Sequence, residues 1–110
     1  MSVSEQRETY NGWSNYPTWA VNLWIDNDQG IQEATLEVVR DAMERSTFNV
    51  LSGKTTERYE VSSALKQWVT DEETGLVPDL GASVAGDLLG YALDGVDWYE
   101  IADAWIEVSS

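Results

Sequence analysis

The sequence contains no cysteine and no histidine among its 110 residues. Without cysteine, the chain can form neither a disulfide nor a thiolate metal site. Without histidine, it lacks the commonest general base and the commonest side-chain metal ligand. No glycine-rich loop follows a strand-like run, so a phosphate cradle is not expected either. We therefore predict a protein that is not an enzyme and that has no cofactor and no metal site.

Basic residues are also scarce, with six lysines and arginines against 20 acids and a net charge of −14. The last base is Lys66, and ten acidic residues follow it. Such a surface repels phosphates and anionic lipids and attracts basic protein surfaces. We therefore expect no direct binding to nucleic acid or to a membrane, because a nucleic-acid-binding surface is normally basic.

The sequence has no apolar run near the roughly 20 residues of a membrane span. Its polar beginning, Ser2 to Glu8, lacks the apolar core of a signal peptide. A cytoplasmic location is the expectation. The acidity is also compatible with simple solubility and with adaptation to high salt, which the presence of only two lysines would suit.

With 43% apolar residues, a chain of this length can bury a core of its own. We predict a flexible tail over residues 1–9 and a single helical domain over residues 10–110. The predicted fold class is all-α, a compact bundle of about five helices with an aromatic-rich core.

The first helix is expected to begin at Asn15 or Tyr16, because Pro17 suits a first helical turn. Residues four apart give it a broad apolar face that we assign mainly to the core: Trp19, Ala20, Leu23 and Trp24.

A second helix is predicted over residues 31–45, with two adjacent apolar lines. The first line holds Ile31, Ala34, Val38 and Ala42, and the second holds Thr35, Val39 and Met43. Residues 46–54 are expected to form a loop whose apolar side chains turn inward: Phe48, Val50 and Leu51.

A third helix is expected to begin near Thr55 or Thr56, with apolar residues at helical spacing: Val61, Ala64, Leu65, Trp68 and Val69. A fourth should start at Pro78 and Asp79 and end at Gly95, with its apolar stripe on Leu80, Val84, Leu88 and Ala92. Gly86 and Gly90 weaken this helix by about 1 kcal/mol each. We therefore expect a neighbouring helix or tryptophan ring to approach them closely.

The last helix carries the clearest start signal. Asp97 and Glu100 form a capping box, and Val96 can pack on Ile101 as a hydrophobic staple. The stripe predicted to be buried comprises Trp98, Ile101, Trp105 and Val108.

Two further patterns have features of binding sites. Asp26, Asp28 and Glu37 have part of the spacing of a calcium loop, but Gly30 lies one position early for that turn, which favours a capped helix end. Tyr10, Trp13 and Tyr16 lie outside regular helical spacing, where aromatic residues can anchor a protein interface.

Two blocks of sequence resemble a family of small phage, prophage and plasmid proteins described only as a domain of unknown function. The first runs from Tyr10-Asn11-Gly12-Trp13 through Leu23-Trp24-Ile25-Asp26-Asn27-Asp28, and Pro17 stands where relatives would have glutamate. The second includes Leu65-Lys66-Gln67-Trp68-Val69, Pro78-Asp79-Leu80-Gly81-Ala82 and Val96-Asp97-Trp98-Tyr99-Glu100-Ile101-Ala102. The resemblance implies an accessory protein of a mobile element, acting in the cytoplasm of the host, and it supplies no catalytic residues.

In that context, the acidity suggests a DNA mimic that blocks a basic nucleic-acid-binding surface of a host defence complex, as an anti-CRISPR or anti-restriction inhibitor. Asp97 and Glu100 are set aside because capping explains them. The predicted acidic contacts are Asp71, Glu72, Glu73, Asp94, Asp103 and Glu107, with Tyr10, Trp13 and Tyr16 as aromatic contacts. The alternative is an interaction scaffold or homo-oligomer that uses an aromatic surface, and a homodimer is compatible with the sequence.

Overall fold

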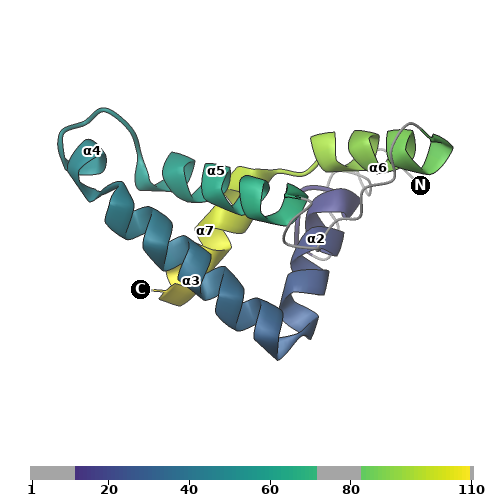
Figure 1. The fold of residues 1–110 in the computed structure, drawn as a ribbon, viewed down its shortest axis with the longest axis horizontal. Helices are drawn as coiled ribbons and strands as arrows, with labels where there is room; N and C mark the ends of the chain where they lie inside the picture. The colour runs from purple at the N-terminus through teal and green to yellow at the C-terminus, as the bar shows by residue number, and fades with distance from the viewer. Residues whose placement is uncertain (1–11, 72–82, 110) are drawn as a thin grey trace.

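Helices make up almost all of the regular structure in the computed structural model, which describes residues 12–71 and 83–109. Figure 1 shows their arrangement. In chain order they are α2 (Tyr16–Asn27), α3 (Gln29–Arg45), α4 (Thr47–Leu51), α5 (Glu57–Thr70), α6 (Val84–Asp94) and α7 (Trp98–Ser109). No strand occurs within these two ranges. The predicted all-α class is confirmed. None of the described helices is long and apolar enough to cross a membrane.

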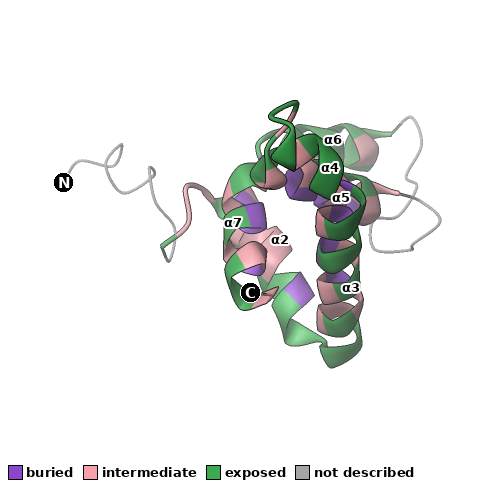
Figure 2. Cartoon of the chain, turned by 90° about the vertical axis from the view of Figure 1, so that its left-hand side faces the viewer, coloured by how far each residue is buried: buried purple, intermediate pink, exposed green. Residues whose placement is uncertain are grey.

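One core holds α2, α3, α5 and α7 together, and the buried segments of these helices face one another (Figure 2). Its buried apolar residues are Ile25, Val39, Ala42, Val61, Leu65, Val69, Val96, Ile101, Ala102 and Trp105. Trp105 is the one aromatic residue in this set. Trp13, Trp68 and Trp98 are partly exposed and pack against this core. The core is mainly aliphatic, so the structure does not confirm an aromatic-rich core.

Helix α2 begins where the sequence predicts, because the Asn15 side chain accepts a hydrogen bond from the Thr18 backbone N–H at 3.0 Å. Its buried residues are Thr18 and Ile25, seven positions apart and therefore on one face. Trp24 is 72% exposed, and Leu23 is also exposed. Their assignment to the core is wrong, because Trp24 is rotated by about 100° from Ile25 around the helix.

Asp28 forms the corner between α2 and α3. It is the C-cap of α2 and the N-cap of α3, and its carboxylate accepts a hydrogen bond from the Ile31 N–H at 3.0 Å. A capping role therefore accounts for this member of the calcium-like spacing. In α3, the buried residues are Thr35, Val39 and Ala42, which lie mainly on the second of the two predicted apolar lines.

The segment after α3 differs from the prediction. Thr47 to Leu51 form the short helix α4 instead of a loop. Phe48 and Leu51 do not turn inward, since they are 74% and 82% exposed. Five residues make little more than one turn, too short to produce a recognisable helical period in the sequence.

Helix α5 confirms its predicted start, because the Thr56 hydroxyl accepts a hydrogen bond from the Tyr59 N–H at 3.1 Å. Buried Val61, Leu65 and Val69 then repeat every four residues along its inner face.

Helix α6 departs most from the sequence prediction. Its N-cap is Ser83, and the expected start at Pro78 and Asp79 lies outside the described residues, as does Leu80. No residue of α6 is buried, and Val84 and Leu88 of the predicted stripe are exposed. A methyl group added at Gly90 would meet no atom within 4 Å, so the close packing predicted at this glycine is wrong. Gly95 ends the helix as expected.

Helix α7 begins as predicted, with the Asp97 carboxylate accepting a hydrogen bond from the Glu100 N–H at 3.1 Å. In a complete capping box, the Glu100 side chain would accept from the Asp97 N–H. Here both groups bond instead to residues at the start of α2. The Asp97 N–H donates to the Thr18 hydroxyl at 2.8 Å. The Glu100 carboxylate accepts from the Ser14 N–H at 3.0 Å. Both residues thus fix α7 against the start of α2.

The inner face of α7 completes the core. Ile101, Ala102 and Trp105 are buried, and the Trp105 indole N–H donates to the Asn22 side-chain oxygen at 2.9 Å. Val108 is exposed, so its place in the predicted buried stripe is wrong. The first two turns of α7 supply the buried residues, and Val108 lies beyond them.

Candidate functional site

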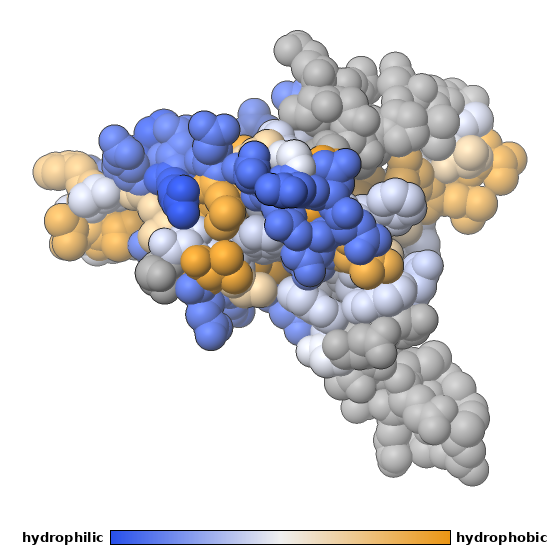
Figure 3. Space-filling view, turned by 90° about the horizontal axis from the view of Figure 1, so that it is seen from below, coloured by the Kyte–Doolittle hydropathy of each residue, from blue (hydrophilic) through white to orange (hydrophobic). Residues whose placement is uncertain are grey.

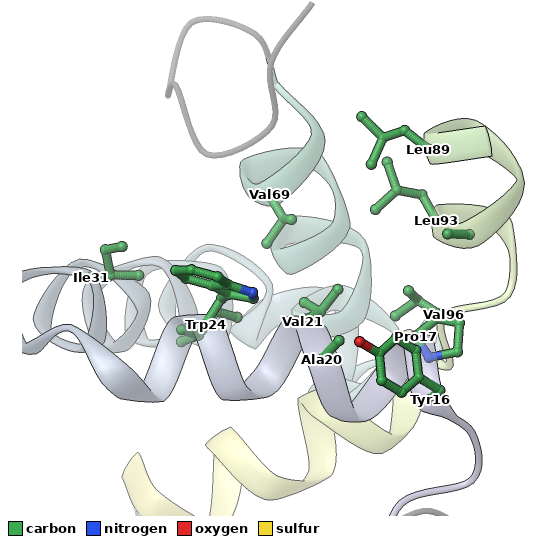
Figure 4. A pocket seen from close by; sticks show the side chains of 12 residues that line it. Tyr16, Pro17, Ala20, Val21, Trp24, Ile31, Val69, Leu89, Leu93 and Val96 are labelled. Carbon is green, nitrogen blue, oxygen red and sulfur yellow. The ribbon is translucent and has the colours of Figure 1, made fainter. Parts of the chain in front are cut away.

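An apolar cavity of about 420 Å³ lies where α2, α5 and α6 meet (Figure 4). Helix α2 lines it with Ala20, Val21 and Trp24, α5 with Val69, and α6 with Leu89 and Leu93. None of the described side chains that line it carries a charge. The size falls within the range of roughly 300–1,000 Å³ typical of ligand pockets.

Helix α2 can serve both the core and the cavity because its apolar residues extend around more than one face. Ile25 is buried in the core and also lines the cavity, together with Ala20 and Trp24, which lie four residues apart. Tyr16 and Pro17 close one end of the cavity, as Figure 4 shows.

Helix α6 forms the opposite wall. Leu89 and Leu93 lie four residues apart and point toward α5 in Figure 4. The Asn15 side-chain amide donates to the Gly95 carbonyl at 2.7 Å, which ties the end of α6 to the start of α2. Leu88 and Tyr91 lie on the outer side of the same helix and are exposed.

Acidic residues end two of the helices that line the cavity. Asp71 is the C-cap of α5, two positions after Val69, and Asp94 directly follows Leu93 at the end of α6. The sequence has no lysine or arginine after Lys66. Two helices that line the cavity therefore end in acidic residues, in a part of the chain that has no base.

The predicted acidic contacts do not all belong to this region. Asp103 and Glu107 are exposed and lie one turn apart on the solvent side of α7. Asp103 accepts a hydrogen bond from the Arg58 guanidinium at 3.0 Å, and Arg58 also lies 4.7 Å from the centre of the Tyr99 ring. Asp71 and Asp94 thus lie at the ends of two helices that line the cavity, whereas Asp103 and Glu107 lie on a separate helix.

The aromatic candidates are also divided. Trp13 packs against the core, partly exposed, which favours a structural role for it. Tyr16 is exposed on the cavity, with its ring centre 5.6 Å from that of Trp19. Tyr10, Glu72 and Glu73 lie outside the described residues.

Sequence reasoning missed Trp24, Leu89 and Leu93 as components of a surface site. The signal available was the breadth of the apolar faces, because α2 carries more apolar residues than one core-facing stripe requires. A broad apolar face is compatible with a core, with a surface site or, as in α2, with both.

The described residues offer no grouping for metal chemistry. No set of three or more histidine, cysteine, aspartate or glutamate side chains within them could hold a metal ion. What the arrangement can do is bind apolar groups and attract cations next to them.

Comparison with known proteins places the chain in a family. Residues 6–110 match the model of a family of unknown function, DUF7249. The chain belongs to this family. No curated protein and no solved structure shows significant similarity to this DUF7249 protein.

Proposed function

We propose that this DUF7249 protein is a non-enzymatic inhibitor that occupies a basic nucleic-acid-binding surface of a host defence complex. The observation that carries the proposal is the charge layout, with ten acids and no base after Lys66. Carboxylates on such a surface compete with phosphates for the lysines and arginines of a partner.

Helical spacing supports the proposal further. Asp103 and Glu107 are one turn apart on α7, and Asp94 ends the preceding helix. Residues four positions apart are separated by about 6 Å along the helix axis, so they present neighbouring negative charges to one side. The ion pair between Asp103 and Arg58 is half-exposed, and such pairs contribute little to stability, about 0–1 kcal/mol. A stronger cationic partner can therefore displace it.

The biological setting is part of the same proposal. The resemblance to phage, prophage and plasmid proteins suggests a product of a mobile element that acts in the host cytoplasm against a restriction or CRISPR system. The absence of histidine and cysteine supports inhibition by binding instead of by catalysis.

The test is to express the protein in bacteria that carry a restriction or CRISPR system and to measure phage plating. We expect plating to rise with the wild type and to fall back with the triple variant Asp94→Asn, Asp103→Asn and Glu107→Gln. The matched control removes three exposed carboxylates from α3 with Glu33→Gln, Glu37→Gln and Glu44→Gln. It should retain inhibition.

Two outcomes would contradict the mimic. If both triple variants lose inhibition equally, total charge and not a defined surface is responsible. If the wild type does not raise plating against any system tested, the anti-defence role is wrong. With the captured complex in hand, binding should weaken steeply as salt rises, and DNA or RNA should displace the protein.

A second candidate is a self-assembling scaffold, in which apolar contacts at the ends of the molecule would outweigh the repulsion between two acidic chains. Hydrophobic side chains gather at the α4 end and at the α6 end, which lie at opposite ends of the long axis (Figure 3). Leu51 and Tyr91 are each 82% exposed at these ends. Head-to-tail contacts between two different surfaces produce rings or filaments. Sedimentation velocity over a range of concentrations tests this, and Leu51→Ser should abolish any assembly.

A further inference from the structure

The apolar cavity between α2, α5 and α6 is open to an occupant. Trp24 lines it and remains 72% exposed, and no residue of the α6 wall is buried. Leu88 and Tyr91 are also exposed, on the outer side of α6. Exposed apolar surface that is contiguous, as in this cavity, typically marks an interaction site on a small protein.

Charge determines which occupant fits. The described lining residues are uncharged, the two lining helices α5 and α6 end at Asp71 and Asp94, and no base follows Lys66. A surface on a chain with a net charge of −14 favours an occupant that combines apolar side chains with basic ones. A second copy of the chain would bring its own net charge of −14 to this surface, which electrostatic repulsion disfavours.

The shape of the cavity favours an occupant with a row of apolar side chains over a small single ligand. Two of its walls carry such a row, with Ala20 and Trp24 on α2 and Leu89 and Leu93 on α6, each pair four residues apart. Side chains spaced by one helical turn match partner side chains at the same spacing, as in the binding of an amphipathic helix in a groove.

We propose that this cavity receives the apolar side chains of a basic amphipathic segment of a protein partner. Leucine-like side chains of the segment enter between Trp24 and Leu89, and its lysines or arginines meet Asp71 and Asp94. The inference deepens the proposed function, since it rests on a basic partner, and it adds an apolar anchor that nucleic acid cannot supply.

A synthetic peptide tests the proposal directly. The probe is a fluorescently labelled helix-forming peptide of about 18 residues, with leucine on one face and lysine on the other. Its affinity is measured by fluorescence anisotropy at about 50 mM and about 500 mM NaCl. We expect Trp24→Ala/Leu89→Ala to weaken binding about 30-fold at low salt, the loss typical of removing a central anchor, and to weaken it at high salt too.

The chain supplies a matched control. Phe48→Ala/Leu51→Ala also removes one aromatic and one leucine side chain, both exposed, from α4 at the other end of the molecule. This variant should bind the peptide within about twofold of the wild type, because its changes lie outside the cavity. Circular dichroism and urea unfolding of both variants show whether the fold is retained.

A measurement on the wild type does not depend on the variants folding. With unlabelled peptide, the methyl signals of Val69, Leu89 and Leu93 should shift in NMR spectra, whereas those of Leu51 should not. Unshifted cavity methyls at saturating peptide would overturn the proposal. So would equal affinity for a peptide whose leucines are replaced by serine, because charge alone would then explain binding.

The remaining outcomes also decide the question. If a peptide with glutamate in place of lysine binds as well, the cavity takes apolar segments of any charge and the basic partner is wrong. If the wild type dimerises and Trp24→Ala/Leu89→Ala is monomeric, the occupant is a second copy. Loss of phage inhibition in the Asp94/Asp103/Glu107 variant without loss in the cavity variant would leave the proposed function standing and remove only this inference.

Discussion

Helices α6 and α7 follow one another in the sequence and have almost equal lengths, 11 and 12 residues. They differ in how much of their surface is buried. Helix α7 buries Ile101, Ala102 and Trp105, whereas α6 has no buried residue. Both are rich in apolar side chains. The difference therefore lies in how each helix is attached and not in its hydrophobicity.

Directional contacts account for much of that difference. The backbone and side chains of α7 and its cap are bonded to Ser14, Thr18 and Asn22 around α2. Helix α6 is linked to α2 by the bond from Asn15 to the Gly95 carbonyl at its end. Helix α7 thus contributes buried side chains and hydrogen bonds to the stability of the domain, while α6 leaves apolar surface exposed.

The largest effect that separates the two helices should come from their apolar side chains. Ile101→Ala should lower the free energy of unfolding by about 2–5 kcal/mol, because it leaves a cavity in the core. Leu88→Ala in α6 should change it by less than about 0.5 kcal/mol, since that side chain is exposed. Urea unfolding followed by circular dichroism measures both. Similar losses in the two variants would mean that α6 belongs to the core.

A smaller effect is expected from the polar contact that positions α7. Thr18 is fully buried, and its hydroxyl accepts from the Asp97 N–H and donates to the Asn15 side-chain oxygen. Thr18→Val keeps the shape but removes both bonds, and it should cost about 1–3 kcal/mol in urea unfolding. Thr47→Val is the control, because that hydroxyl bonds only at an exposed position in α4. Equal losses would show that the contact with α7 contributes nothing beyond a local bond.

The smallest global effect should come from Gly90→Ala in α6. A methyl group there meets open space and removes the conformational cost of a helical glycine, so α6 should gain about 0.5–1 kcal/mol locally. Hydrogen exchange should show slower exchange of α6 amides with little change in Tm. Gly53→Ala, at a φ of +81°, should instead destabilise the turn before α5. A lower Tm for Gly90→Ala would mean that a neighbour packs against this glycine.

The helix boundaries that the sequence predicted depend on local chemistry. Asn15, Thr56 and Asp97 cap their helices as expected, because a capping bond joins residues three positions apart. The face that each helix buries depends on partners distant in the sequence. The prediction for Leu23 and Trp24 therefore names the wrong surface, although the helix that contains them was predicted correctly.

The candidate site was only partly predictable for the same reason. The sequence predicts Asp71 and Asp94 as contact residues, because they belong to the acidic part of the chain after Lys66. The cavity depends on α6 lying opposite α2, which brings Leu93 and Ala20 to one space from distant parts of the chain. No local period encodes that placement.

The bonds that hold α7 also have a consequence for synthesis of the protein. Ser14 and Glu100 are 86 positions apart, and Thr18 and Asp97 are 79 apart. The ribosome therefore translates α2 long before Asp97, whose N–H donates to the buried Thr18 hydroxyl in the folded domain. Until then, the inner faces of α2, α3 and α5 lack their cover, and such exposed surface invites aggregation or chaperone binding. This domain is expected to complete its fold only after α7 has been synthesised, and a ribosome that stops within α6 would leave a chain for proteases to remove.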